Sequence, residues 1–437
     1  MRRRAACRNG FFLGAVGWAL VLQAANLEAA NSGADLANDW PTGRGPHSDG
    51  KSPLTGIRKD WAGGLRKVWE TAELSQGDVK TNVSMSSPVI ARGVAVVMGR
   101  SDDRDLVFGF EAETGKKLWV SEYPAKAEKQ WSGVGNGARA APVIEEDLVY
   151  TLSAYGHLAC WELRTGNRKW LLNARDDSKT QVPFWGVCGS PAIYGRNIIV
   201  KVGGYEQGPN APLVMAYDKA SGTLAWKSAD APGSWAPLAV LRLAGEDQLL
   251  AWHSGGLKAL DPTNGKELWN IPWRTSYDCH VSLPAVEGFD LFLTSGYRTG
   301  CQAFSLQGGR PTPLWPANKA VASCCSAPVV HAGHIYSFTG NGADGALKCL
   351  ELKTGAEKWS TPDFANGTLV LVDGCLLCLG YKGKLGLVEA SPDAYRKLGE
   401  MKAFDAQEPP AYAAPAVACG KVYVRYLGKM VCYDLLR

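Results

Sequence analysis

The feature that most constrains the fold of this chain is a nine-residue pattern that recurs five times. Each copy begins with an acidic residue, has Gly at its fifth position and ends with Trp. The copies are EAETGKKLW ending at Trp119, ELRTGNRKW at Trp170, DKASGTLAW at Trp226, DPTNGKELW at Trp269 and ELKTGAEKW at Trp359. A longer, degenerate copy, SLQGGRPTPLW, ends at Trp315. Repetition at intervals of tens of residues indicates one structural unit used many times.

A second element recurs between these copies. It is a small residue followed by Pro and a short apolar stretch, with a weaker copy that begins near Gly367 and has no Pro. The prolines are Pro88, Pro142, Pro191, Pro237, Pro284, Pro328 and Pro415. Together the two elements divide the chain into eight units.

Each unit reads as four short strands. In the second unit, the segments 142–144, 148–152, 157–161 and 168–172 are each bounded by turn-forming residues. The Gly of the Trp-ending pattern supplies the positive φ that a tight turn between the last two strands needs. One such sheet cannot bury both of its faces, but sheets stacked around an axis can. We therefore predict an all-β fold, an eight-bladed β-propeller of four-stranded antiparallel blades.

The two ends of the chain predict how the ring closes. The eighth unit ends in VCYDLLR at Arg437 and has no Trp-bearing strand, whereas an unassigned strand, LRKVWE, precedes the first unit. We expect this N-terminal strand to complete the last blade. The seventh unit has Leu398 near the Trp position. Blade-to-blade docking is assigned to seven indoles: Trp69, Trp119, Trp170, Trp226, Trp269, Trp315 and Trp359.

These Trp-ending repeats resemble the tryptophan-docking motifs of quinoprotein alcohol dehydrogenases and of related PQQ-like propellers, including BamB-type outer-membrane assembly proteins. The resemblance covers about residues 60–437. The segment DWPTGRGPHSDG, residues 39–50, is similar to the start of secreted bacterial PQQ-like repeat proteins. For the dehydrogenases the resemblance implies PQQ and calcium in a central funnel. For the assembly proteins it implies a protein partner.

The N-terminus predicts export. Residues 1–30 combine four Arg with the apolar run 11–22, which is typical of a signal peptide. We divide the chain into this signal, an extension over 31–60 and a single propeller over 61–437. Without the four Arg and one Glu of the first 30 residues, the net charge of +5 falls to +2. Such a balance argues against a nucleic-acid partner. We expect a periplasmic or secreted monomer with no transmembrane segment after the signal.

The cysteines fall into three groups. Cys160, Cys349 and Cys432 occupy a position where other units have Gly or Ala, so we interpret them as core thiols. Cys375 and Cys378 lie in an apparent strand, which sends their side chains to opposite faces. The third group comes shortly before the first strands of three units and should surround the mouth of the central funnel: Cys188, Cys279, Cys324 and Cys325. A vicinal disulfide between Cys324 and Cys325, a Cys/His metal site and unreacted thiols all remain open for this group.

The residues that precede the first strands also bear on catalysis. The only acid in the six residues before each Pro is Asp278, which would be the general base of a dehydrogenase. The candidate funnel-lining residues for a cofactor are Asn82, Asn136, Arg139, Trp185 and Trp235. One acid is few for both calcium ligation and base catalysis. We therefore expect no catalytic residue, no resident metal and no PQQ, with a PQQ- and calcium-dependent alcohol or sugar dehydrogenase as the alternative.

Unequal loop lengths point to a binding surface. The expected long connections are 99–105, 121–137, 173–187 and 203–211, and they carry Tyr123, Trp131, Phe184, Trp185 and Tyr205. Because binding residues are often placed on loops held by a rigid scaffold, we expect the partner on the funnel face over blades 1–3. The predicted function is an exported, non-catalytic binding or scaffold propeller for an envelope protein or glycan. An outer-membrane assembly factor is the second alternative.

Overall fold

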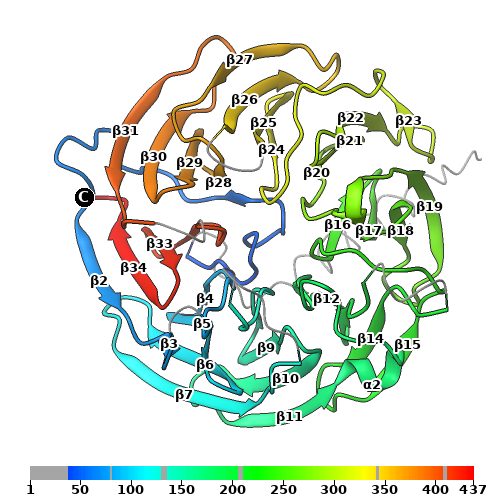
Figure 1. The fold of residues 1–437 in the computed structure, drawn as a ribbon. Helices are drawn as coiled ribbons and strands as arrows, with labels where there is room; N and C mark the ends of the chain where they lie inside the picture. The colour runs from blue at the N-terminus through cyan, green and yellow to red at the C-terminus, as the bar shows by residue number, and fades with distance from the viewer. Residues whose placement is uncertain (1–37, 79–80, 129–134, 205–209, 341–343, 407–410) are drawn as a thin grey trace, which may run out of the picture.

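The computed structural model describes residues 38–437, apart from 79–80, 129–134, 205–209, 341–343 and 407–410. The expected signal at residues 1–30 lies outside the described residues, as do Trp131 and Tyr205. The fold is the predicted ring of eight antiparallel, four-stranded blades (Figure 1). Among the described residues, no helix is long and apolar enough to cross a membrane.

The first four blades follow the order of the chain. Blade 1 consists of β4 (Val89–Ala91), β5 (Val94–Ser101), β6 (Arg104–Glu111) and β7 (Lys117–Pro124). Blade 2 consists of β8 (Val143–Glu145), β9 (Leu148–Leu152), β10 (His157–Glu162) and β11 (Arg168–Asn173). Blade 3 consists of β12 (Ala192–Tyr194), β13 (Asn197–Val200), β14 (Met215–Asp218) and β15 (Leu224–Lys227). Blade 4 consists of β16 (Ala239–Leu243), β17 (Glu246–His253), β18 (Gly256–Leu260) and β19 (Glu267–Pro272).

The next three blades repeat the arrangement. Blade 5 consists of β20 (Ala285–Glu287), β21 (Asp290–Ser295), β22 (Gly300–Ser305) and the short β23 (Thr312–Pro313). Blade 6 consists of β24 (Val329–His331), β25 (His334–Thr339), β26 (Ala346–Glu351) and β27 (Glu357–Thr361). Blade 7 consists of β28 (Gly367–Val372), β29 (Cys375–Gly380), β30 (Lys384–Glu389) and β31 (Lys397–Lys402). Two short helices, α2 (Ala174–Ser178) and η2 (Ser276–Asp278), lie in connections.

Blade 8 confirms the predicted closure of the ring. It consists of β32 (Ala416–Ala418), β33 (Lys421–Tyr426) and β34 (Lys429–Asp434) from the C-terminus, completed by β2 (Lys67–Thr71) from the N-terminus. β2 runs antiparallel to β34, with Trp69 opposite Cys432. The short strand β3 (Ser75–Gln76) then pairs in parallel with β5 of blade 1. The first and last parts of the chain therefore share one sheet.

The Trp-ending repeat packs each blade on the next. The Trp119 indole donates a 2.9 Å hydrogen bond to the Leu163 carbonyl of blade 2. A Cβ added to Gly166, which has a φ of 71°, would lie 2.6 Å from that indole. The same position must therefore turn the chain and admit a ring from the neighbouring blade, and only Gly does both. Equivalent indole-to-carbonyl bonds run from Trp69, Trp170, Trp315 and Trp359 to Ala112, Lys219, Leu352 and Ser391.

The alternation of Cys, Ala and Gly in the third strands follows from the same indoles. Cys160 lies opposite Trp170, Ala216 opposite Trp226 and Gly109 opposite Trp119. A Cβ on Gly109 would lie 2.2 Å from the Trp119 ring, so the position admits only a small side chain. Cys375 and Cys378 of β29 belong to two different core clusters, which confirms that their side chains leave opposite faces of the strand.

Blade 7 fills its missing Trp position from another part of the chain. Its outer strand β31 has Leu398, which is half-buried. Trp61, which precedes β2 in the chain, packs on this strand, since a Cβ on Gly399 would lie 2.6 Å from the Trp61 side chain. Trp61 is 3% exposed. The sequence repeat could not reveal this substitute, because Trp61 belongs to no repeat unit.

Residues 39–52, which we call the axial strap, cross the middle of the ring (Figure 1). At one end, Trp40 exchanges two backbone hydrogen bonds with Ile90 of blade 1, and Pro41 accepts one from Ile144 of blade 2. At the other end, β1 (Lys51–Ser52) pairs in parallel with β28 of blade 7. The strap thus connects the innermost strands of blades 1 and 2 with that of blade 7, which lies beyond blade 8 in the ring.

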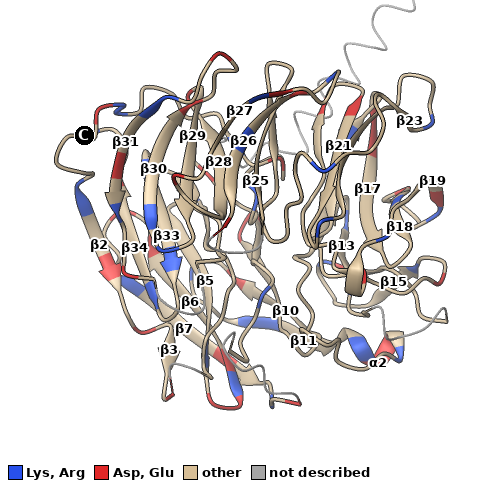
Figure 2. Ribbon diagram, turned by 45° about the horizontal axis from the view of Figure 1, so that its top comes forward, with Lys and Arg blue, Asp and Glu red and all other residues tan. Residues whose placement is uncertain are grey.

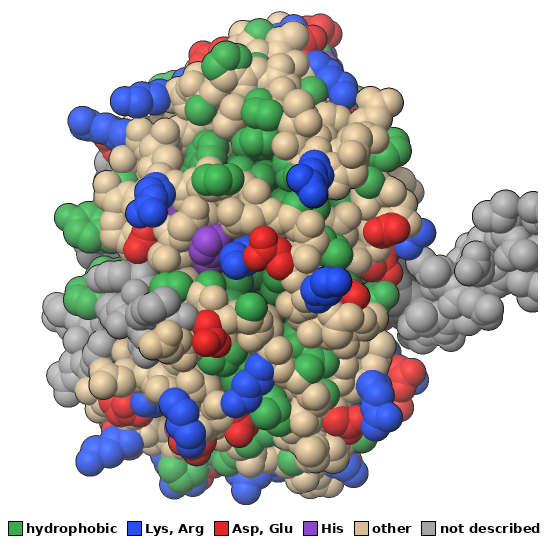
Figure 3. All heavy atoms as spheres, turned by 90° about the vertical axis from the view of Figure 1, so that its right-hand side faces the viewer, with side chains coloured by type: hydrophobic (Ala, Val, Ile, Leu, Met, Phe, Trp, Pro, Cys, Tyr) green, Lys and Arg blue, Asp and Glu red, His purple; other side chains and the backbone are tan. Residues whose placement is uncertain are grey.

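Charged residues lie mainly on the outer strands and connecting loops of the ring (Figure 2). On the side over blades 4 and 5, basic and acidic side chains are interspersed (Figure 3). The innermost strands are apolar by contrast, and β4 and β32 are buried along their whole length.

Candidate functional site: the axial cavity

A cavity of about 390 Å³ lies on the propeller axis. Its volume falls in the range of small-molecule sites in proteins. The axial strap closes one end through Thr42, Gly43, Arg44 and Ser48. The wall comes from the segments that precede or begin the innermost strands of all eight blades, with Tyr297 added from the turn between β21 and β22. The wall residues are Met85, Ser87, Arg139, Ala141, Trp185, Cys188, Ser190, Pro191, Trp235, Pro237, Leu238, Cys279, Val281, Leu283, Tyr297, Cys324, Cys325, Ala327, Thr368, Tyr412 and Ala414.

The cavity brings together part of the predicted set. Arg139, Trp185 and Trp235 line it, together with the four cysteines expected at the funnel mouth. Trp185 is 39% exposed and Tyr297 is 42% exposed, so these two aromatic residues mark the open rim. Phe184 lies beside Trp185 in an edge-to-face contact with ring centroids 4.9 Å apart.

The other predicted residues lie away from the cavity. The Asn82 amide is buried and donates to the Gln76 carbonyl at 2.6 Å and to Asp102 at 3.0 Å, so it organises a loop of blade 1. Asn136 is buried, and its backbone N–H donates to the Thr81 carbonyl at 2.7 Å. Asp278 ends the short helix η2 and is half-exposed, and burial raises the pKa of its carboxyl.

Two of the expected long loops are different in the structure. Residues 99–105 form most of a tight hairpin, because β5 continues to Ser101 and β6 begins at Arg104. Tyr123 belongs to β7 and is fully buried, so it offers no surface for a partner. Alternating burial along β7 places this ring in the core between blades 1 and 2.

The two basic residues of the cavity are held by backbone carbonyls. The Arg44 guanidinium donates to the carbonyls of Leu369 at 3.2 Å, Pro328 at 3.0 Å and Asp49 at 3.2 Å. Burial lowers the pKa of Arg44 to about 10, which leaves it charged at neutral pH. Arg139 donates to Gly135 and Gly137, and burial lowers its pKa as well. Arg139 was predicted from sequence to line the funnel, whereas Arg44 was not, because the path of the strap across the ring leaves no local pattern in the sequence.

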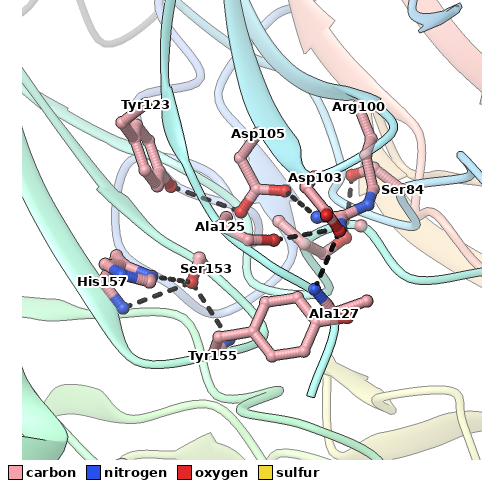
Figure 4. Close-up of polar contacts among 12 residues, drawn as sticks. Ser84, Arg100, Asp103, Asp105, Tyr123, Ala125, Ala127, Ser153, Tyr155 and His157 are labelled. Carbon is pink, nitrogen blue, oxygen red and sulfur yellow. Dashed lines mark hydrogen bonds and ion pairs between the residues drawn. The ribbon is translucent and has the colours of Figure 1, made fainter. Parts of the chain in front are cut away.

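Arg100 and Asp105 belong to a buried polar cluster (Figure 4), and both influence the charge of Arg139. Arg100 and Asp105 are fully buried and joined by a 2.9 Å ion pair. Arg100 also donates to the Ala125 carbonyl at 3.0 Å and lies over the Tyr155 ring at 5.4 Å. Burial raises the pKa of Asp105 to about 6, although Arg100 opposes the shift. The negative charge of Asp105 favours the charged form of Arg139.

The described wall residues do not match a calcium site. Among the described residues that line the cavity, none is Asp or Glu. The oxygen donors there are hydroxyl groups, whereas calcium in proteins takes carboxylate and carbonyl oxygens. In the described part of the chain, no group of three or more His, Cys, Asp or Glu side chains is arranged to hold a metal.

Comparison with known proteins places the chain in a family. A family model described as outer membrane protein assembly factor BamB matches residues 57–186 and 180–361. The chain belongs to this family. Its relatives include the quinohemoprotein alcohol dehydrogenase ADH-IIG of Pseudomonas putida, 24% identical over 213 residues, which are 48% of this chain and 28% of the relative. A second dehydrogenase of that organism, ADH IIB, is 27% identical over 29% of this chain and 18% of its own length.

Solved structures show the same fold. BamB from Moraxella catarrhalis superposes with a TM-score of 0.58 at 16% identity, over 85% of this chain and 97% of that one. ADHIIG from Pseudomonas putida superposes with a TM-score of 0.56 at 14% identity, over 94% of this chain and 82% of that one. The PQQ-like propeller and its distant similarity to BamB are therefore established for this family member.

Proposed function

We propose that this chain is an extracytoplasmic, non-catalytic binding propeller whose axial cavity holds a small, flat, anionic molecule. The observation that supports the proposal is the composition of the cavity wall. Its two charged residues, Arg44 and Arg139, are both basic, and no carboxylate accompanies them among the described wall residues. Trp185 and Trp235 add flat apolar surface. Fixed cations in a mostly apolar cavity favour an anion with an aromatic body.

A pair of matched fluorescent probes tests this. 8-Anilinonaphthalene-1-sulfonate carries an anionic group, and N-phenyl-1-naphthylamine has the same rings without it. We expect one equivalent of the sulfonate to bind, with an affinity at least about tenfold above that of the neutral probe, because a hydrogen bond to a charged group contributes about 1.5–3 kcal/mol. Equal affinity for the two probes would contradict an anion site.

Substitutions locate the bound probe. Arg139→Gln should weaken binding of the sulfonate about 10- to 100-fold and leave binding of the neutral probe nearly unchanged. Arg196→Gln is the matched control, because Arg196 is 85% exposed and pairs with Asp218 on the surface of blade 3. If both variants bind the sulfonate like the parent chain, the probe sits elsewhere and the axial site is rejected.

The alternative of a PQQ- and calcium-dependent dehydrogenase, which the relatives suggest, is tested separately. The two Pseudomonas putida proteins are quinohemoprotein alcohol dehydrogenases, and the matched region is less than a third of either one. Purified protein is incubated with PQQ, with and without calcium, and alcohol or sugar oxidation is followed with an artificial electron acceptor. We expect no turnover. Calcium-dependent turnover would replace the non-catalytic assignment with a dehydrogenase.

The similarity to BamB supports the alternative of an assembly factor that binds a protein partner. The aromatic pair Phe184 and Trp185 is exposed at the rim, with 51% and 39% of each residue accessible. An envelope protein or glycan that docks over this rim would cover the cavity. Binding of a defined envelope partner that is lost in a Phe184→Ala, Trp185→Ala variant, with the probe affinity retained, would favour the assembly-factor alternative.

A further inference from the structure

Four cysteines from three blades meet in the wall of the axial cavity. Cys188 precedes blade 3, Cys279 precedes blade 5, and Cys324 and Cys325 precede blade 6. Cys279 and Cys324 form a buried cluster with Trp235, and the other two cysteines pack against it. These four cysteines are far apart in the chain, but the closed ring brings them together as one group of thiols. The group lies in the wall of a cavity large enough to admit small molecules.

Cys324 is the central member of this group. Its thiol is flanked by those of Cys279 and Cys325. These two neighbours lower the pKa of Cys324, whereas Cys324 and burial raise the pKa of Cys279. A thiolate, and not a thiol, attacks disulfides. Cys324 is thus the sulfur best suited to attack, with a thiol on either side.

Covalent geometry distinguishes the two neighbours. Disulfides join residues whose Cα atoms are usually about 4.4–6.8 Å apart. Adjacent residues have Cα atoms about 3.8 Å apart, which is below that range. Cys325 is adjacent to Cys324 in the chain, whereas Cys279 reaches Cys324 from another blade. The spacing of adjacent residues therefore disfavours Cys325 as the partner of Cys324 and leaves Cys279, which packs in the same buried cluster. The structure does not join these cysteines.

We propose that Cys279 and Cys324 form a dithiol–disulfide exchange site in the axial cavity, which reacts with small-molecule disulfides. The Cys324 thiolate attacks one sulfur of the incoming disulfide, forms a mixed disulfide and releases the other half as a thiolate. Cys279, after loss of its proton to solvent, attacks the Cys324 sulfur and releases the second half. Two protein thiols are oxidised to one disulfide, and one small disulfide is reduced to two thiols. This inference does not rest on the anion site.

Oxidised glutathione tests the proposal on the full chain. The reduced protein is incubated with it, the remaining thiols are alkylated, and the cysteines are mapped by mass spectrometry. We expect a crosslink between the peptides of Cys279 and Cys324. The Cys279→Ser variant should stop at glutathione on Cys324, and Cys324→Ser should give neither product. Cys325→Ser is the matched control and should still form the crosslink.

A second measurement separates exchange chemistry from a folding defect. Oxidation should raise the midpoint of thermal unfolding of the parent chain and of Cys325→Ser, because the crosslink restricts the unfolded chain. It should leave the midpoint of Cys279→Ser unchanged. A crosslink between Cys324 and Cys325 in the parent chain would overturn the proposal. The proposal would also be overturned if glutathione modified Cys188 of the folded protein and left Cys324 unmodified.

Discussion

At the residue scale, Lys201 is a buried amino group outside the residues that line the cavity. It is 2% exposed, and its ammonium group donates to the Trp252 carbonyl at 3.1 Å. Burial lowers its pKa to about 7, against the opposing influence of Cys188. In the unfolded chain the same side chain keeps its proton to about pH 10. The unfolded state therefore binds more protons than the folded state between these values.

This difference predicts a stability that depends on pH. The free energy of unfolding should rise as the pH increases from about 7 to about 10, since it rises wherever the unfolded state binds more protons. The Lys201→Met variant should lack the part of this pH dependence that comes from Lys201. Its free energy of unfolding at pH 7 should not be lower than that of the parent, because an apolar side chain avoids the cost of desolvation. Urea unfolding at pH 7, 8, 9 and 10 measures both effects. Identical pH dependence in the two proteins would refute the explanation.

The ion pair of Arg100 and Asp105 gives a second prediction at this scale. Asp105→Asn leaves a fully buried guanidinium without the carboxylate at 2.9 Å, and we expect a loss of about 3–5 kcal/mol in the free energy of unfolding. The double variant Arg100→Met, Asp105→Leu should lose less, since no charge remains buried. Denaturant unfolding of Arg100→Met, of Asp105→Leu and of the double variant measures the coupling. Additive effects would show that the pair does not interact.

At the element scale, the contact between an outer strand and the next blade can be divided into its parts. Trp119 both packs on Gly166 and donates to the Leu163 carbonyl. Trp226 packs on Gly265, but its indole N–H has no hydrogen-bond partner among the described residues. The two positions therefore differ in this hydrogen bond and in burial, since Trp119 is buried and Trp226 half-buried.

Substitution by Phe should expose this difference. Trp119→Phe should cost about 1 kcal/mol more than Trp226→Phe, because only the first change leaves a carbonyl without its donor. Trp119→Ala should cost about 3–5 kcal/mol, the usual range for loss of a buried aromatic side chain. Equilibrium unfolding of the three variants provides the comparison. Equal losses for the two Phe variants would mean that the hydrogen bond contributes nothing.

Elements were predictable from sequence where local chemistry repeats. The strands of blade 2 match their predicted bounds to within one residue, because Pro142 precedes the first strand and Gly156 and Gly166 mark two of the three turns. The cavity was predictable in part, since residues before an innermost strand face the axis, as Arg139 and Trp235 do. Arg44 and Trp61 were not predictable. Each acts on strands more than 200 residues away in the chain, and no local pattern encodes that contact.

At the scale of the whole molecule, the ring depends on the strand supplied by the N-terminus. A chain that begins at residue 73 lacks both the axial strap and β2, so β34 keeps an open hydrogen-bonding edge. We expect a lower midpoint of thermal unfolding and the appearance of dimers or larger species, since exposed edges pair with other chains. Calorimetry and size-exclusion chromatography measure these effects. A chain that begins at residue 38 is the control and should behave as the parent does.

The shared sheet of blade 8 also has a consequence for the order of events in biosynthesis. β2 emerges from the ribosome first, but its partner β34 is made last, more than 350 residues later. Until β34 is made, β2 has no neighbouring strand in its sheet. Contacts between residues far apart in the chain also form slowly. The final circle can therefore close only after β34 has been made, and a polypeptide interrupted before β34 is a natural target for quality-control proteases.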